Sequence, residues 1–201
     1  MKYIRKTSKE ITNNFLEELL KDRGILPSEA ADIEKFYKPT IDNELPPNLL
    51  DNMEEGYNLL MKHIKNHSKI LIIVDPDCDG YTSAALFYLY IKRCYAEYKP
   101  QLNYIMPIDK KHGLEQHIDI FLEKHICDLI ICPDSSSNDY EFHKILKDTG
   151  YDILVIDHHE SEKYSEDAIV INNQLSGRYS NKALSGVGVV YKFFEYCEMK
   201  E

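Results

Sequence analysis

Acidic and histidine residues directly follow three separate apolar runs of the sequence. The runs are KILIIV, DLIIC and DILVI, and each is typical of a strand buried on both faces. The residues that follow or close them are Asp75, Asp77, Asp79, Asp134, Asp157, His158 and His159. So many carboxylates in one place repel one another unless cations compensate them, and oxygen ligands mixed with imidazole suit Mn²⁺ or Mg²⁺. Two such ions about 3.5–4 Å apart form a clamp for phosphoryl displacement.

Each cluster taken alone has a simpler interpretation. The segment DPDCDG could be a turn with solvated aspartates or a fragment of a calcium loop, and Asp134 could cap a helix. His158 and His159 could be ordinary surface histidines. The joint occurrence favours a shared site, because ligands of open parallel sheets bind at the carboxyl ends of the strands.

The elements that must position these residues alternate from Lys69 onward. We expect an α/β fold, a mostly parallel sheet flanked by helices, because strands alternating with helices imply βαβ units. The expected strands are 69–74, 101–106, 128–133, 152–157 and 168–173. The expected helices are 81–98, 115–125, 139–149 and one that begins at 185.

The first part of the chain is predicted to be an N-terminal helical extension over residues 1–66, followed by the core over 67–201. Ser8 can cap a first helix that ends near Gly24, Pro27 opens a second, and a third runs from Leu49 to Ile64.

Composition limits the class of protein. The chain has 201 residues, of which 43% are hydrophobic, enough for the core of one domain. It shows no membrane span and no secretory signal, and its five cysteines include no CxxC pair, so we expect reduced thiols and a cytoplasmic location. The net charge of −10 counts against a nucleic-acid partner. It does not exclude one, since the carboxylates of a metal site are counted before their cations and a local basic track suffices.

Three motifs carry a resemblance to a known family. DPDCDGYTSAA, PDSSSND and IDHHE together resemble motifs one to three of the DHH phosphoesterase superfamily, and within it the RecJ-like single-strand-specific DNA exonucleases. The stretch INNQLSGRYSNKALSGVGVVYKF and the N-terminal segments LKDRGI and EKFYKP are similar to that group too. The proline of DPDCDG and the DSSS variant resemble phage-encoded members.

The resemblance implies a role for each residue of the three clusters. It implies that two ions, Mn²⁺ or Mg²⁺, are held by Asp75, Asp77, Asp79, Asp134 and His158. His159 would contact the scissile phosphate or assist the leaving group, and Asp157 would orient the triplet. The implied reaction is 5′-to-3′ hydrolysis of single-stranded DNA, with a single-strand binding protein or a helicase as further partners.

Two further segments are candidate substrate contacts. Ser185, Gly186 and Gly188 open a helix whose free N–H groups favour an anion, although tight helix–sheet packing explains these glycines equally well. Lys111 and His112 lie, with Lys110, in a small basic loop after the 101–106 strand, which could also be a solvated turn. The hydroxyls of Ser135–Ser137 are expected to cap the next helix rather than to bind phosphate.

The sequence also departs from the family. RecJ-like proteins have another aspartate ligand downstream of the GVGV helix and a second domain, and this chain ends at Glu201 before either. We therefore expect the encoded site to be incomplete, as part of a split or longer protein. Two alternatives stay open: a DHH phosphoesterase acting on oligonucleotides, cyclic dinucleotides or pyrophosphate, and a non-catalytic DHH-fold binding subunit.

Overall fold

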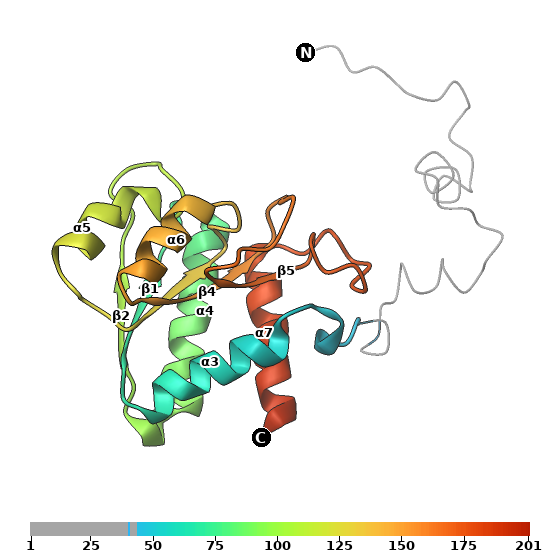
Figure 1. Ribbon diagram of the computed structural model, residues 1–201. Helices are drawn as coiled ribbons and strands as arrows, with labels where there is room; N and C mark the ends of the chain where they lie inside the picture. The colour runs from blue at the N-terminus through green and yellow to red at the C-terminus, as the bar shows by residue number, and fades with distance from the viewer. Residues whose placement is uncertain (1–39, 41–43) are drawn as a thin grey trace, which may run out of the picture. The chain divides into compact units, whose positions relative to one another are not determined.

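The computed structural model describes residue 40 and residues 44–201, drawn in colour in Figure 1. The chain divides into two units, Met1–Glu44 and Leu45–Glu201, and the description below concerns the second. The two helices expected within residues 1–39 lie outside the described residues. In the described part of the chain, no helix has the length and apolar composition needed to cross a membrane.

The centre of the second unit is a five-stranded sheet of order β2-β1-β3-β4-β5. Every neighbouring pair of strands is parallel, as the alternation of strands and helices predicts. The bounds are β1 Lys69–Ile73, β2 Gln101–Ile105, β3 Leu129–Pro133, β4 Asp152–Asp157 and β5 Ile169–Asn172. All five ranges agree within one residue at each end with those expected, because continuous β-branched runs between polar loops leave little choice of register.

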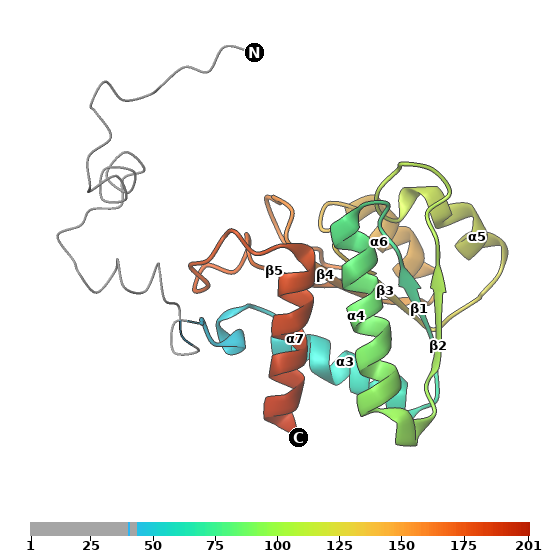
Figure 2. The same ribbon diagram turned by 180° about the vertical axis from the view of Figure 1, so that it is seen from behind.

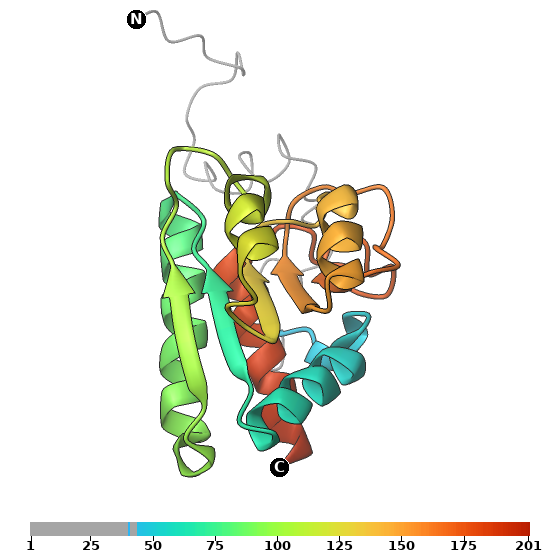
Figure 3. The same cartoon turned by 60° about the vertical axis from the view of Figure 1, so that its left-hand side comes forward.

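Helices cover both faces of the sheet, and Figure 3 shows the sheet between the two layers. One face carries three α-helices, which share a single apolar core with the sheet: α3 Met53–Lys65, α4 Cys78–Cys94 and α7 Gly186–Lys200. The other face carries α5 Ile118–Glu123 and α6 Tyr140–Asp148, which pack on a second, smaller core. Short 3₁₀ turns lie at Pro47–Leu49, Ala96–Tyr98 and Glu115–His117.

Helices α4 and α7 run side by side, as Figures 1 and 2 show from opposite sides. Their contact is aromatic: the rings of Tyr90 and Phe194 stack with centroids 3.9 Å apart, and Phe87 lies 5.0 Å from Phe194. Offset and edge contacts of this kind add to the burial of apolar area. This pairing matters for the site because both helices begin at the carboxyl edge of the sheet.

Helix α3 belongs to the same compact unit as the sheet. Leu60 and Ile64 are fully buried in the core that α3 shares with α4 and α7. The compact unit begins at Leu45, whereas the sequence predicted a division after residue 66. The apolar face of α3 indicated that this helix packs against another part of the protein. That part is the central sheet, whose contacting strands lie much farther along the chain.

Candidate functional site

The loop after β1 is shaped by one aspartate and one glycine. Asp77 is the N-cap of α4, and its Oδ1 accepts a hydrogen bond of 2.9 Å from Gly80 N. A Cβ at Gly80 would lie 2.6 Å from the carbonyl oxygen of Asp75, so only glycine fits there. The tight turn brings the carboxylates of Asp75 and Asp77 to the same end of β1.

Asp134 follows β3 in an unusual backbone conformation. Its φ is 72° and that of Ser136 is 76°, values in the left-handed region that cost non-glycine residues free energy. The Asp134 side chain is 1% exposed, and among the described residues no donor makes a hydrogen bond to either carboxylate oxygen. A buried carboxylate without donors is costly, so this arrangement fits a site for a cation or a proton.

The segment after β4 is organised by the carboxylate of Asp157. Its Oδ1 accepts from His158 N at 2.7 Å, His159 N at 3.2 Å and His159 Nδ1 at 2.7 Å. Its Oδ2 accepts from Ser137 N at 3.1 Å. Asp157 therefore fixes the backbone of the triplet and the ring of His159, as a positioning carboxylate does.

The ring of His158 is held by a different group. Its Nδ1 lies 3.0 Å from the carbonyl oxygen of Leu184, which can only accept, so Nδ1 carries the hydrogen. In the neutral ring, Nε2 then presents a lone pair 3.1 Å from Asp134 Oδ1. Two acceptor atoms this close need a cation or a proton between them. The sequence suggested Asp157 as the group that orients the triplet, and the structure divides this task between Asp157 and Leu184.

These side chains converge in two overlapping groups at the carboxyl edge of the sheet. Ligand atoms of Asp75, Asp77 and Asp134 lie within 4.8 Å of one another, and so do those of Asp134, Asp157, His158 and His159. Asp134 is common to both groups. The donor set, carboxylate oxygen with imidazole nitrogen, fits hard or borderline divalent cations.

The electrostatics of the site support a compensating cation. Burial, followed by the negative charges of Asp79 and Asp157, raises the pKa of Asp134 to about 8. Burial also raises the pKa of Asp75, although His112 opposes this shift. Both carboxylates are thus disfavoured as anions by their own surroundings.

In the pair formed by Asp157 and His159, hydrogen bonding affects the pKa values more than burial does. Burial alone would raise the pKa of Asp157, but hydrogen bonds from His159, Ser137 and the His158 backbone outweigh it and lower the pKa. The hydrogen bond to Asp157 in turn raises the pKa of His159 to about 9, so this imidazole is protonated at neutral pH. His159 is half-exposed and can present its Nε2 proton to a ligand.

Asp79 has a contact that the sequence did not suggest. Its carboxylate accepts from Gly186 N at 2.8 Å and Val187 N at 2.9 Å, so it joins α4 to the N-terminus of α7. His158 Nε2 lies 3.7 Å from Asp79 Oδ2, at the margin of the acidic cluster. A metal-binding role for Asp79 stays a prediction.

The N-terminus of α7 contacts the aspartates around it. Ser185 is the N-cap and accepts from Gly188 N at 3.3 Å, while the N–H groups of Gly186 and Val187 face Asp79. A Cβ at Gly186 would lie 2.6 Å from Asp134 Cβ and closer still to its carboxylate. The tight-packing interpretation therefore accounts for Gly186, and phosphate binding by Ser185, Gly186 and Gly188 stays a prediction.

The loop after β2 reaches the same edge. His112 Nδ1 lies 2.6 Å from Asp75 Oδ2, and Gly113 N donates to Asp75 Oδ1 at 3.3 Å. Lys111 is exposed on this loop. With Ser135–Ser137, Asp157 and His159, His112 lines a cavity of about 290 Å³. The serines do not cap α6, whose N-cap is Asp139, so that expectation was wrong: Ser137 instead pairs with Asp157 and Asn172.

The end of β5 and the residues after it belong to a stretch that resembles the family, but the sequence assigned no role to them. Asn172 is fully buried, and its Nδ2 donates to Ser137 Oγ at 2.8 Å and to the His159 carbonyl at 2.9 Å. Gln174 Nε2 donates to the carbonyl oxygens of His158 and of Lys182. The only signal in the sequence is an Asn-Asn-Gln run at the end of an apolar strand, since amides that bind backbone carbonyls leave no fixed spacing.

The fold and the site define a parallel α/β domain with aspartates and histidines gathered in two overlapping groups that could hold cations. The model of the DHH family, N-terminal domain, matches residues 69–201. The chain belongs to the DHH family.

Curated relatives agree with this assignment. The chain is 38% identical over 185 residues to a Bacillus subtilis (strain 168) protein named "Putative SPbeta prophage-derived single-strand DNA-specific exonuclease YorK", an alignment that covers 92% of this chain and 30% of the relative. It is 31% identical over 157 residues to the single-stranded-DNA-specific exonuclease RecJ of Haemophilus influenzae, covering 76% and 27%. The chain thus spans less than a third of the length of these relatives.

Solved structures show the same fold. A crystal structure of exonuclease RecJ bound to manganese superposes with a TM-score of 0.66 at 21% identity, covering 78% of this chain and 40% of that one. RecJ from Thermus thermophilus in complex with Mn²⁺ gives 0.63 at 21% identity, covering 90% and 24%.

Proposed function

We propose that this chain is the metal-binding catalytic part of a hydrolase that cleaves phosphodiester bonds in single-stranded DNA from the 5′ end. The observation that carries the proposal is Asp134: buried, without hydrogen-bond donors among the described residues, and facing the lone pair of His158. The names of the relatives, single-strand DNA-specific exonucleases, support the substrate class.

Two cations, Mn²⁺ or Mg²⁺, are proposed for the two overlapping groups. Asp75, Asp77 and Asp134 would hold one, and Asp134 and His158 the other, with Asp79 next to both. When bound, such ions supply Lewis-acid stabilisation of the phosphate oxygens and lower the pKa of water. They would also relieve the mutual repulsion that raises the pKa of Asp134.

His159 is the proposed group of the protein that acts on the substrate directly, and Asp157 holds its ring in place. Asp157 accepts from Nδ1 and raises the pKa of His159 to about 9, so at neutral pH Nε2 carries a proton as well. From this position it donates a hydrogen bond to an oxygen of the scissile phosphate or to the leaving group, a form of charge stabilisation. Asp157 acts through His159, as a positioning residue.

Further contacts to the strand are proposed on the two flanking segments. Lys111 and His112 follow β2, and His112 lies against Asp75 and lines the cavity. Ser185, Gly186 and Gly188 would approach the adjacent phosphate from the start of α7. A cytoplasmic location is proposed from the cysteine pattern, and a single-strand binding protein or helicase as partner from the resemblance alone.

Hydrolysis of an end-labelled single strand in Mn²⁺ tests the proposal. Asp134→Asn and His158→Ala should each lower turnover by at least ~100-fold, since they remove proposed metal ligands whose supporting groups alone are worth 10–100-fold. Asp152→Asn, at the opposite end of β4 from the site, is the control and should retain turnover. Equal rates for Asp134→Asn and wild type would refute the proposal, and faster hydrolysis of a dinucleotide than of a long strand would favour a small-substrate enzyme.

A further inference from the structure

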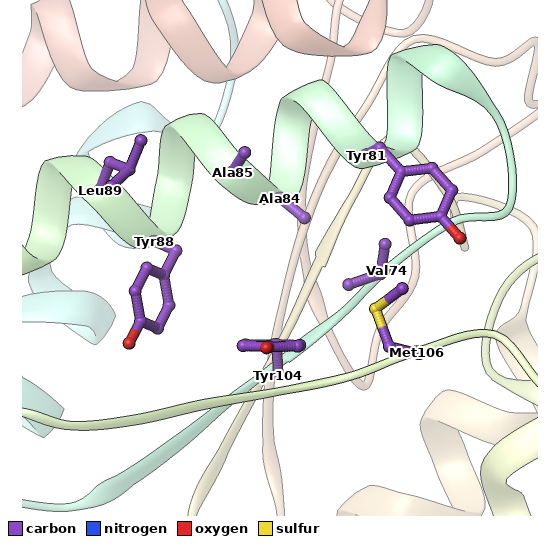
Figure 4. Close-up of a pocket in the computed structure, with 8 residues that line it drawn as sticks. All are labelled: Val74, Tyr81, Ala84, Ala85, Tyr88, Leu89, Tyr104 and Met106. Carbon is purple, nitrogen blue, oxygen red and sulfur yellow. The ribbon is translucent and has the colours of Figure 1, made fainter.

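An apolar groove lies between α4 and the edge strand β2 (Figure 4). Its volume is about 300 Å³, at the small end of the ~300–1,000 Å³ of ligand pockets. It is lined by Val74, Tyr81, Ala84, Ala85, Tyr88, Leu89, Tyr104 and Met106. None of these eight residues carries a charge, although the chain is strongly acidic.

The groove exposes an unusual amount of large apolar surface. Leu89 is 63% exposed, Tyr104 59%, Met106 46% and Tyr81 44%. Single exposed apolar residues are ordinary, but several that adjoin one another mark a binding surface. The groove exists because α4 packs toward α7 and β1 and leaves the α4-side face of β2 uncovered.

One end of the groove adjoins the acidic cluster directly. Val74 immediately precedes Asp75, and its N–H donates to the carbonyl of Ile105, next to Met106. Tyr81 follows Gly80 in the first turn of α4. From Tyr81 to Leu89 the groove extends ~12 Å along the helix, at 1.5 Å per residue.

The chemistry of the lining identifies one occupant. Uncharged walls disfavour phosphates. The hydroxyls of three tyrosines are the main polar groups of the lining, so it offers too few hydrogen bonds to distinguish the edges of different bases. Tyrosine rings instead offer faces on which any unpaired base can stack. Tyr88 and Tyr104 meet edge to face, 5.9 Å apart, and Lys92 Nζ lies 5.6 Å from the Tyr88 ring, where it can meet a phosphate outside the groove.

We propose that this groove binds one or two unpaired bases of the strand whose phosphate lies at the Asp75–Asp134 cluster. The inference rests on the proposed function and adds a reason for strand selection. A base paired in a duplex cannot turn into the groove, whereas a free base can. Because the groove offers stacking with few polar contacts, it selects single strands without reading their sequence.

Binding of two probes by the full chain tests the groove. The probes are a fluorescein-labelled oligothymidylate and a strand of equal length with abasic sugars, measured by anisotropy at one salt concentration with Ca²⁺ in place of Mn²⁺. Tyr104→Ala should weaken binding of the oligothymidylate by ~5-fold or more and leave the abasic strand unchanged. Tyr104→Phe, which keeps the ring, should bind as wild type does. Tyr191→Ala, an exposed tyrosine on α7, is the matched control.

The outcomes separate the groove from the proposed function. Equal loss for both probes, no loss at Tyr104→Ala, or no preference of the wild type for the strand with bases would overturn the base-binding proposal. A dimer in light scattering that Tyr104→Ala dissociates would assign the groove to a second copy instead. Hydrolysis that depends on Asp134 but not on Tyr104 would overturn the groove alone. Base-dependent binding with unchanged hydrolysis in Asp134→Asn would overturn the proposed function alone.

Discussion

Strand β4 carries an aspartate at each end, Asp152 at its start and Asp157 at its last residue. At the starting edge of the sheet, Asp152 contacts two lysines and an imidazole: Lys62 Nζ at 2.8 Å, Lys147 Nζ at 2.9 Å and His63 Nε2 at 3.0 Å. Burial would raise the pKa of Asp152, but these three partners outweigh it and lower the pKa. This carboxylate is compensated within the protein.

At the opposite edge, His159 compensates Asp157, but Asp134, which follows β3, lacks such compensation. Asp134 lies among carboxylates, and no lysine or arginine pairs with it among the ion pairs of the described residues. Glycines at 80 and 186 let its neighbours approach, and the left-handed φ of Asp134 adds a backbone cost. At one edge of the sheet, Asp152 contributes to stability. At the other edge, the uncompensated Asp134 lowers stability but leaves a site for a ligand.

The largest predicted effect comes from filling the space beside Asp134. Gly186→Ala would place a methyl group against the Asp134 carboxylate, and α7 or the carboxylate must then move. We expect Mn²⁺ affinity, measured by titration calorimetry, to fall by ~10–100-fold, as for changes that misplace metal ligands. We also expect a loss of ~1–3 kcal/mol in the free energy of unfolding from overpacking.

Gly188→Ala is the control on the same helix. A Cβ there would meet Leu184 at 3.4 Å, an ordinary contact, and would lie next to no carboxylate. Affinity and stability should stay near those of the wild type. Equal effects of the two substitutions would mean that α7 tolerates no alanine in its first turn. This result would contradict a specific role of Gly186 beside Asp134.

The sequence predicted the residues at one edge of the sheet and not those at the other. Buried apolar runs located β1, β3, β4 and β5, and β2 was located although it is largely exposed; the parallel arrangement then placed Asp75, Asp134 and Asp157 at one edge. The opposite edge was not foreseen, since Lys62, His63 and Lys147 are spread over two helices with no spacing that relates them to Asp152.

The contacts within the site were also beyond the sequence. That Asp79 binds the N-terminus of α7 depends on two helices starting side by side, 107 residues apart at Gly186. Likewise, Leu184 orients His158 through a backbone carbonyl, and any residue type can supply that group. Motifs record side chains, so interactions with backbone atoms leave little trace in them.

A smaller effect, of opposite sign at the two edges, is expected in thermal stability without metal. The pKa of Asp134 is raised to about 8 in the folded chain, against ~4 unfolded, so the folded state holds more protons and stability falls as pH rises between these values. Asp134→Asn should therefore raise Tm at pH ~8 and have little effect near pH ~4. Asp152→Asn should lower Tm at neutral pH by ~2–4 °C for each kcal/mol lost from the free energy of unfolding. The reason is that the contacts that lower the pKa of Asp152 contribute stability above pH ~4.

Addition of Mn²⁺ should reverse the order of the Tm values of wild type and Asp134→Asn. A cation that binds only the folded state raises its Tm, so wild type and Asp152→Asn should gain and Asp134→Asn should not. Calorimetry with and without the ion measures both parts. If Asp134→Asn and Asp152→Asn shifted Tm in the same direction without metal, the contrast between the edges would be wrong.

The smallest effect concerns a single proton on His159. Its pKa is raised to about 9, chiefly by the hydrogen bond to Asp157 and against the effect of burial. The pair therefore contributes stability that is complete below ~6.5, the unfolded value, and is lost as pH rises through ~9. In Asp157→Asn the carboxylate charge is gone, and the NMR titration of the metal-free protein should show His159 moving toward ~6.5. A wild-type His159 that already titrates near ~6.5 would show that Asp157 orients the ring without charging it, and the proton assigned to His159 in the reaction would need another source.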